Sequence, residues 1–311
     1  MNIKRTILPL ISIATLLLEG CGFLNENQST TSMKQEADIT KESETFISVQ
    51  DYDGTGYTLR NASPAIEKLA RENEKDINEA FKDYFSQEYS TEVTVHNLAA
   101  ANDAITAYVE SKSNPNFHTY AVVPVRQGEI LYDEVFSQGG KVENAIASGL
   151  YAWVYEDEFQ QLDQLLEAFM EHNPITGVTD EALNRVIGAG YSTPYYRTAV
   201  LDKSLIDISQ DYIDHPNRTK RDWANALQST DYNHKDVTIS LHLYMAVQGN
   251  EPEQSILSKL EEEIRNHSNT IPQGTYHIDI NDNYINKVTG TGSKDNTLSI
   301  SYPEPIIILK E

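Results

Sequence analysis

The sequence of 311 residues predicts an α+β fold in which helices pack on small antiparallel sheets. Two observations lead to this class. Strand-like runs at 104–110 and 117–125 are joined by Ser111–Asn116, a segment of turn residues, as in an antiparallel hairpin. In addition, helical and strand patterns do not alternate regularly along the chain, as they would in a parallel sheet built from βαβ units.

The elements before residue 135 predict one helix on a small sheet. Ser63 and Pro64, followed by Glu67, are typical of a helix start. Apolar residues then recur every three or four positions, which predicts a single helix over 64–85 with a polar middle at 71–76. A strand-like run at 91–98 precedes the two runs of the hairpin.

The elements after residue 140 begin with a long predicted helix over 142–172, interrupted by Glu156-Asp157-Glu158. A shorter helix over 179–189 ends before Gly190. The remaining predicted elements are an extended segment at 195–200, a weak helix at 205–227 broken at Pro216, a strand at 238–247, a helix at 253–265, and strands at 275–280 and 297–301. We expect one domain over 50–311, with sub-units 50–135 and 140–311 as the alternative.

The N-terminus has the pattern of an export signal. Lys4 and Arg5 precede an apolar run at 7–18, which is short of the ~20 residues that a spanning helix needs. Gly20 then stands directly before Cys21, the one cysteine of the chain. A structural cysteine near a ragged N-terminus is the less favoured interpretation.

The segment Leu18, Glu19, Gly20, Cys21 resembles the lipobox of bacterial lipoproteins. The resemblance implies cleavage after Gly20, a diacylglycerol thioether and an N-acyl chain on Cys21, and residence on the outer face of the cell membrane. Glu19 departs from the small or apolar residue usual at its position, which puts the efficiency of cleavage in question.

Composition and charge are consistent with a location on the outer face of the cell membrane. The net charge is −23, and removal of residues 1–20 takes away a net +1 and leaves −24. Such a charge opposes binding to nucleic acid and to anionic lipid surfaces, so we expect membrane contact through the acyl chains alone. Residues 21–49 are rich in Asn, Gln, Ser, Thr, Lys and Glu and are expected to form a flexible acidic tether.

The order of segments resembles a family of lipoproteins of unknown function from Gram-positive bacteria. It is carried by the lipobox, the acidic tether, Gly56-Tyr57, the helix–hairpin unit, the long aromatic helix, Thr176–Ala182, and then Val186, Gly188, Gly190 and Tyr191. The resemblance covers most of the chain from residue 50 and implies lipidation at Cys21. It implies no catalytic residue.

Motifs for catalysis are absent from the sequence. There is no Gly-x-Ser-x-Gly elbow, Walker loop, His-Glu-x-x-His or penicillin-binding Ser-x-x-Lys set. His242 and His277 lie in predicted strands and would form a metal pair only by meeting across a sheet; half-exposed strand positions are the favoured interpretation. We therefore expect no catalytic residues and no cofactor beyond the lipid.

Two acidic loops are weak calcium candidates. Asp279, Asn281 and Asn283 alternate as in an EF-hand loop, but Tyr284 and Gly290 stand where the motif needs Gly and Glu. A shorter version occurs at Asp51–Gly54. Ordinary turn chemistry explains both loops and is favoured over calcium binding.

Tyrosines supply the candidate binding surface. Tyr191, Tyr195, Tyr196 and Arg197 cluster after a glycine, and such rings stack on sugars or anchor a protein interface. The favoured alternative is that they pack an extended segment, with their hydroxyl groups reaching water.

Three classes of function remain. The first is a non-enzymatic surface lipoprotein that binds an envelope ligand or protein partner, or has a structural role there. The second is a solute-binding lipoprotein of a transporter, which needs two lobes of parallel βαβ units. The third is an envelope hydrolase that uses acids such as Glu156, Asp157 and Glu158. We expect the first.

Overall fold

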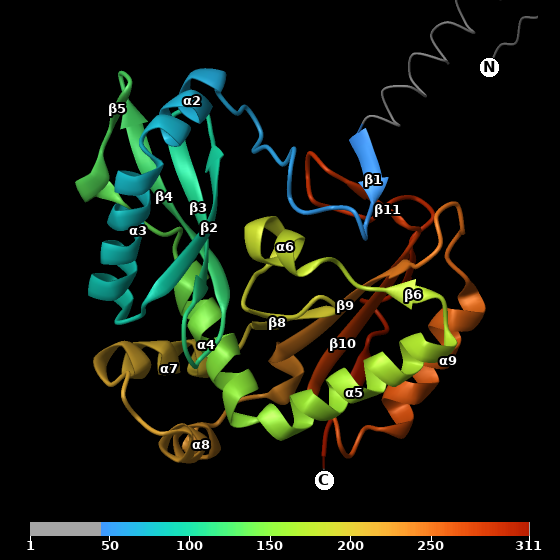
Figure 1. Cartoon of the computed structure of the whole chain (residues 1–311). Helices are drawn as coiled ribbons and strands as arrows, with labels where there is room; N and C mark the ends of the chain where they lie inside the picture. Colours follow the sequence, from blue (N-terminus) through green and yellow to red (C-terminus); the bar gives the residue numbers. More distant parts are fainter. Residues whose placement is uncertain (1–44, 311) are drawn as a thin grey trace, which may run out of the picture. The chain divides into compact units, whose positions relative to one another are not determined.

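The computed structural model describes residues 45–310, and its fold is α+β, as predicted. Within that range the strands form a two-stranded, a four-stranded and a seven-stranded sheet (Figure 1). The leader, Cys21 and the tether up to residue 44 lie outside the described residues. No helix within 45–310 is both long enough and apolar enough to cross a membrane.

The folded chain begins earlier than residue 50. β1 (Phe46–Ser48) pairs antiparallel with β11 (Tyr284–Asn286), with Ile47 opposite Ile285. Val49 is fully buried in a small core beside them. These apolar residues at the end of the predicted tether therefore belong to the fold.

The four-stranded sheet confirms the predicted hairpin. Its order is β2 (Val93–Ala100), β3 (Ala104–Ser111), β4 (His118–Arg126) and β5 (Glu129–Ile130). β3 and β4 are antiparallel, with Tyr108 opposite Tyr120. β5 was not predicted, because two residues carry no detectable alternation.

The predicted helix over 64–85 was wrong in its continuity, since the structure holds two helices. α2 (Pro64–Glu72) ends at Asn73, and α3 (Glu74–Tyr89) begins there. The amide of Asn73 donates to the Leu69 carbonyl oxygen at 2.9 Å, which satisfies a helix-end carbonyl. The polar middle noted in the sequence marks this break.

The predicted helix over 142–172 was also wrong in its continuity. α4 (Lys141–Val154) and α5 (Glu156–His172) meet at Tyr155, directly before the acidic triplet. Those acids open α5, where the positive end of the helix dipole favours them. The interruption in the pattern was therefore a helix boundary.

The seven-stranded sheet is mostly antiparallel but contains one parallel pair. Its order is β12 (Leu298–Ile300), β10 (Gly274–Asn281), β9 (Val237–Met245), β8 (Tyr196–Val200) and β7 (Tyr191–Ser192). β13 (Ile306–Ile308) also pairs with β10, and β6 (Ile175–Thr176) with β9. β9 and β10 are parallel and are connected by α9 (Gln254–Asn266), a βαβ unit that the sequence analysis did not anticipate.

Helix α4 contributes to both large cores. Its residues Val142, Ile146 and Leu150 pack with α2, α3 and the four-stranded sheet. Tyr151 and Ala152, near its end, pack with α5, α9 and the large sheet. In Figure 1, α4 runs from the four-stranded sheet down to the start of α5. The described residues fall in one compact unit.

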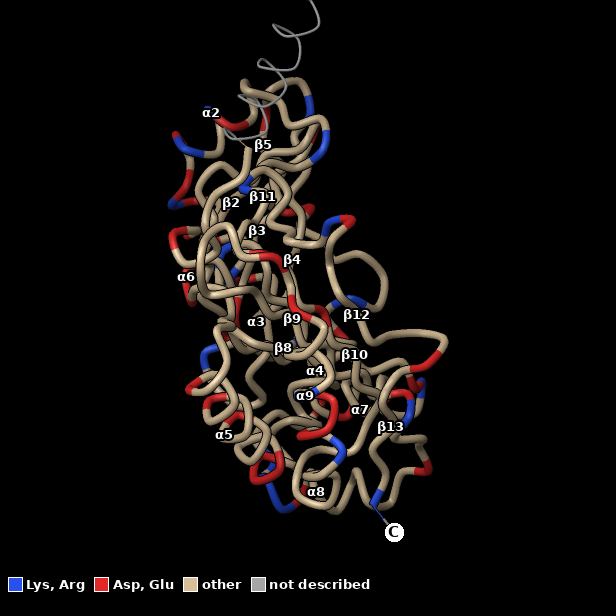
Figure 2. Tube along the Cα trace, turned by 90° about the vertical axis from the view of Figure 1, so that its right-hand side faces the viewer, with Lys and Arg blue, Asp and Glu red and all other residues tan. Residues whose placement is uncertain are grey.

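Three further helical segments complete the fold. The predicted helix over 179–189 forms as α6 (Asp180–Ala182), which continues as a π-helical turn over Leu183–Ile187. The weak helix broken at Pro216 is confirmed as α7 (Lys203–Asp214) and α8 (Lys220–Ser229). Figure 2 shows acidic positions spread over several elements, α5, α6 and α9 among them.

Candidate functional site

The predicted lipidation motif, Leu18, Glu19, Gly20 and Cys21, lies outside the described residues. The other predicted site residues are all described.

The weak calcium candidates are engaged by the protein itself. Asp279 accepts from the Ser299 hydroxyl at 2.6 Å and lies 3.4 Å from His242. The Asn281 amide donates to the Leu243 carbonyl at 3.1 Å. Asn283 is fully buried and donates to the Met245 carbonyl at 2.8 Å, while its Oδ1 has no partner. These side chains hold strands together rather than converge on one point.

The second acidic loop is a local turn. The Asp53 carboxylate accepts from the Thr55 amide at 2.8 Å and lies 3.6 Å from Arg185. The hydrogen bonds from Thr55 lower the pKa of Asp53 below its ordinary value.

The two strand histidines lie near each other on the polar face of β9 and β10. The register places Asp279, not His277, opposite His242. Burial raises the pKa of Asp279, but its hydrogen bonds with His242 and Ser299 act in the opposite sense, and the pKa lies below its ordinary value. Within residues 45–310 no group of three or more His, Cys, Asp or Glu side chains is placed to hold a metal ion.

The tyrosine cluster divides between two faces of β8. Tyr196 is buried in the core, where its hydroxyl donates to Asp163 at 2.8 Å and its ring stacks on Phe159 at 6.0 Å between centroids. Arg197 alternates with Tyr196 along β8 and faces the other side of the sheet, whereas Tyr195 precedes the strand and packs against the same core as Tyr196. Tyr191 is half-buried against Phe159, 5.2 Å between centroids. The four residues therefore do not form one surface.

The acidic triplet of α5 is held in surface ion pairs. Glu156 lies 2.7 Å from the Lys220 ammonium, and Glu158 lies 3.3 Å from that of Lys310. Such pairs are ordinary surface electrostatics and form no catalytic pair across a cleft.

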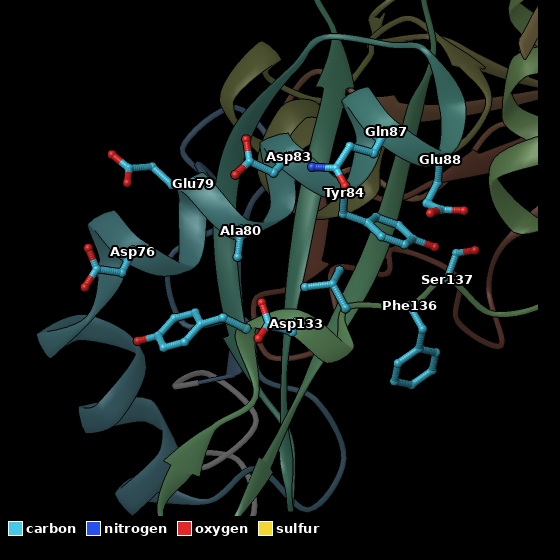
Figure 3. A pocket seen from close by; sticks show the side chains of 12 residues that line it. Asp76, Glu79, Ala80, Asp83, Tyr84, Gln87, Glu88, Asp133, Phe136 and Ser137 are labelled. Carbon is cyan, nitrogen blue, oxygen red and sulfur yellow. The ribbon is translucent and has the colours of Figure 1, made fainter.

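An acidic groove lies between α3 and the segment that follows β5 (Figure 3). Its volume is about 810 Å³. The carboxylates around it are all exposed and come from Asp76, Glu79, Asp83, Glu88 and Asp133. Figure 3 shows Asp133 lying across from the helix that carries the other four. Exposed carboxylates are fully hydrated without a ligand, so this groove identifies no binding partner.

A smaller pocket lies where the four-stranded sheet meets the large one, and we call it the α4 pocket. It has a volume of about 370 Å³. Its wall is built from β4, the first turn of α4, the segment before β7, and β8 with the residue that follows it: His118, Thr119, Tyr120, Gly139, Gly140, Lys141, Asn144, Ala145, Gly188, Ala189, Gly190, Thr198, Ala199 and Leu201.

Two buried polar side chains of the α4 pocket lack hydrogen-bond partners. The Nδ1 atom of His118, a residue 3 % exposed, has none, although its Nε2 lies 2.9 Å from the Asn184 Oδ1. The Thr198 hydroxyl, on a fully buried residue, also has none. A buried polar group without a partner costs roughly 1–3 kcal/mol, so an ordered water or a bound ligand that reached either atom would stabilise the protein.

The electrostatic state of His118 follows from its surroundings. Burial lowers its pKa below the ordinary value of 6.5, while the Asn184 hydrogen bond and the Glu110 charge act in the opposite sense. In the neutral ring, Nε2–H donates to Asn184, and Nδ1 carries an unused lone pair.

Glycines bring the segment before β7 against this histidine. His118 and Gly190 exchange backbone hydrogen bonds of 2.8 Å, which join β4 to the large sheet. A Cβ at Gly188 would lie 2.6 Å from the imidazole ring. A Cβ at Gly190, whose φ is 65°, would lie 2.4 Å from the Thr198 carbonyl oxygen. Only residues without a side chain fit here.

Sequence reasoning did not find the α4 pocket. His118 stands alone in a strand, and its partner Asn184 lies 66 positions away in a π-helical turn, a feature that often occurs at functional sites. The available signal was the pair Gly139-Gly140 before Lys141 at the start of an apolar helix, together with Gly188 and Gly190.

The chain is thus an α+β protein with a pocket of about 370 Å³ at the meeting of two of its sheets. Comparison with known proteins adds the family. The family model described as "Protein of unknown function (DUF1672)" matches residues 39–310, so the chain belongs to the DUF1672 family.

The fold is similar to that of a crystal structure of a DUF1672 family protein from Staphylococcus aureus subsp. aureus Mu50. The TM-score is 0.68 at 15% identity, and the match covers 82% of this chain and 97% of that one. A DUF5037 family protein from Ruminococcus gnavus ATCC 29149 reaches a TM-score of 0.24 and supports no argument. No curated protein matches the chain.

Proposed function

We propose that this protein is a lipid-anchored, extracytoplasmic binding protein, not an enzyme, that holds a small ligand in the α4 pocket. The observation that carries the proposal is the pair of buried, unpartnered groups, His118 Nδ1 and Thr198 Oγ1, on the wall of one pocket. Support for the anchor comes from the leader and Cys21 in the sequence.

The pocket suits binding better than chemistry. Its volume of about 370 Å³ is at the lower end of the range of small-molecule sites. Its lining contains no carboxylate, serine or cysteine, and among the described residues no hydrogen bond joins its one histidine, His118, to the hydroxyl of Thr119 or Thr198. The side chains of Ala145, Ala189, Ala199 and Leu201 and the backbone of four glycines supply the apolar part of the wall.

The two other classes have less support. A transporter-type solute receptor is built from two lobes of parallel βαβ units, whereas β9–β10 is the one parallel pair among the described strands. A hydrolase built on Glu156, Asp157 and Glu158 lacks a cleft with facing carboxylates, since two of these acids pair with lysines.

The anchor is tested in the bacterium that makes the protein. Cells are fed an alkyne-bearing fatty acid, and the full-length protein is isolated and probed for the label. We expect label on the wild type and none on Cys21→Ala. An unlabelled wild type, or equal label on the variant, would contradict the anchor.

The ligand is tested by native mass spectrometry of the full-length protein, released from its own membranes in mild detergent. We expect a bound small molecule on the wild type and its loss in Thr198→Val. Ser48→Ala is the matched control, because Ser48 is also a buried hydroxyl without a partner but lies on β1, outside the pocket. A wild type without a bound mass, or a mass retained in Thr198→Val, would contradict the assignment.

A further inference from the structure

We propose that the free edge of β2 binds an uncharged, extended segment of a partner protein as an added strand. The site is a groove of about 540 Å³, which we call the β2 groove. Its lining includes Val95–Ala100 of β2, the loop 54–58, residues of α2 and α3, and Arg185 of the π-helical turn. No residue lines both this groove and the α4 pocket, so the proposal stands whether or not that pocket holds a ligand.

The groove follows an unpaired edge of the four-stranded sheet. Within that sheet β2 pairs with β3 alone, and Figure 1 shows the other side of β2 facing α6. Six consecutive residues of β2 line the groove, whereas a pocket over one face of a strand would be lined by alternate residues. The groove therefore runs along the backbone edge of the strand.

The register shows which backbone groups point toward this edge. In an antiparallel pair, residues that bond to the partner strand alternate with residues whose N–H and C=O groups point away from it. The Ala101 N–H donates to the Ala104 carbonyl oxygen at 2.8 Å, which fixes the alternation at the turn between β2 and β3. Counted back from there, Ala99 bonds to β3, whereas Leu98 and Ala100 point away from it.

The outward backbone groups are free to pair with another strand. Within residues 45–310, no hydrogen bond from another segment reaches the N–H or C=O groups of Leu98 or Ala100. Such a row of unpaired groups is a template for an extended chain. An antiparallel strand would form two hydrogen bonds with each of the two residues, which is the pattern of recognition by strand addition. The β-bulge at His96 confines this pairing to the part of β2 that follows it.

The walls of the groove are held in place by the protein itself. The Tyr57 hydroxyl lies 2.7 Å from that of Tyr108 on β3, and the two rings meet edge to face at 5.7 Å between centroids. The Asn97 amide donates to the Arg185 carbonyl oxygen at 3.0 Å. A groove that is already formed binds a strand at a lower entropic cost than one that must first be ordered.

The charges of the lining favour an uncharged partner. Arg71 pairs with Glu67 at 2.8 Å, and Arg185 lies 3.6 Å from Asp53, so an incoming carboxylate would meet no unpaired arginine here. Glu74 is exposed, and an exposed ion pair with it would contribute little. The net charge of −23 opposes an acidic partner and a second copy of this chain. Backbone pairing, rather than charge, therefore supplies the affinity.

The test is hydrogen exchange of the full-length protein in neutral detergent, resolved to single amides by mass spectrometry with fragmentation. In the free protein, Leu98 and Ala100 should exchange faster than Asn97 and Ala99, whose N–H groups bond to β3. The probe is a capped hexapeptide of alternating threonine and valine, which matches the ~17 Å that six strand residues span. At saturation, we expect exchange at Leu98 and Ala100 to slow at least about tenfold, so that the alternation along β2 disappears.

Two controls locate the contact. The same peptide methylated at every backbone nitrogen keeps its side chains but has no N–H donors, and should give no protection. Thr58→Trp, at an exposed position of the groove wall, should raise the probe concentration for half-maximal protection about tenfold, the effect of losing one or two hydrogen bonds. Thr94→Trp, at an exposed position of β2 outside the groove, should leave that concentration unchanged.

Several results would overturn the proposal. They are unchanged exchange at Leu98 and Ala100 with the probe, equal protection by the methylated peptide, and an equal effect of the two variants. Slow exchange at both amides in the free protein that depends on protein concentration would also overturn it, because a second copy would then cover the edge.

Discussion

The Nε2 atom of His118 lies 2.9 Å from the Oδ1 atom of Asn184, and this hydrogen bond joins β4 to the π-helical turn after α6. It fixes the ring so that Nδ1 is left without a partner inside the protein. The pocket therefore depends on a contact between segments that are remote in sequence.

Replacing Thr198 with Val tests the buried hydroxyl. In the ligand-free protein, Thr198→Val should leave the free energy of unfolding unchanged or raise it by about 1 kcal/mol, because an unsatisfied polar group is removed at nearly constant shape. Urea denaturation measures this change. A loss of more than about 1 kcal/mol would mean that the hydroxyl has a partner within the protein.

Acid should destabilise the protein through His118. Because burial lowers its pKa in the folded state, the unfolded chain binds the proton first. The contribution of the neutral ring is complete above pH 6.5 and is lost as the pH falls from there toward the folded-state pKa. His234, whose pKa is lowered by burial and by Lys310, adds to the same trend.

The measurement is the free energy of unfolding from pH 7.5 to 5. His118→Gln should flatten the decline, whereas His172→Gln, at the exposed end of α5, should not. An unaltered slope in His118→Gln would show that another group causes the loss.

Gly188→Ala should disturb the pocket through close contact. The added Cβ would lie 2.6 Å from the His118 ring, so the ring or the loop must move, at a cost of about 1–3 kcal/mol in stability. Gly139→Ala is the control, since nothing lies within 4 Å of its Cβ. We expect thermal denaturation to separate the two variants; equal melting temperatures would refute the contact.

Leu150→Ala tests the role of α4 in both cores. Leu150 is 1 % exposed and packs with the four-stranded sheet, whereas Tyr151 beside it packs with the large one. We expect a loss of about 2–5 kcal/mol and faster hydrogen exchange in β3 and β9 alike. Faster exchange in β3 alone would mean that the two cores unfold separately.

Much of the fold was predictable because it depends on local periodicity. The hairpin β3–β4, the strand β9 and the helix α9 all follow from alternation or helical spacing within one segment. The breaks at Asn73 and Tyr155 were visible as polar interruptions but were interpreted as variations within one helix. A polar stretch has the same pattern on an exposed helical turn and at a helix boundary.

The remaining features depend on pairing between distant segments. β1 with β11 and β13 with β10 join segments in which at least one short strand carries no signal of its own. β9 and β10 were each predicted as strands, but their parallel pairing is a contact between distant segments. The α4 pocket is of the same kind. In the sequence, His118 and Thr198 are ordinary strand residues. Their side chains lack hydrogen-bond partners only because of how the folded chain packs around them.

The most direct measurement is a crystal structure, at a resolution that shows ordered waters, of the protein purified from its own cells. We expect non-protein density in the α4 pocket within hydrogen-bonding distance of His118 Nδ1 and Thr198 Oγ1. Density for water alone, or protein groups bonded to both atoms, would contradict the assignment of a ligand site.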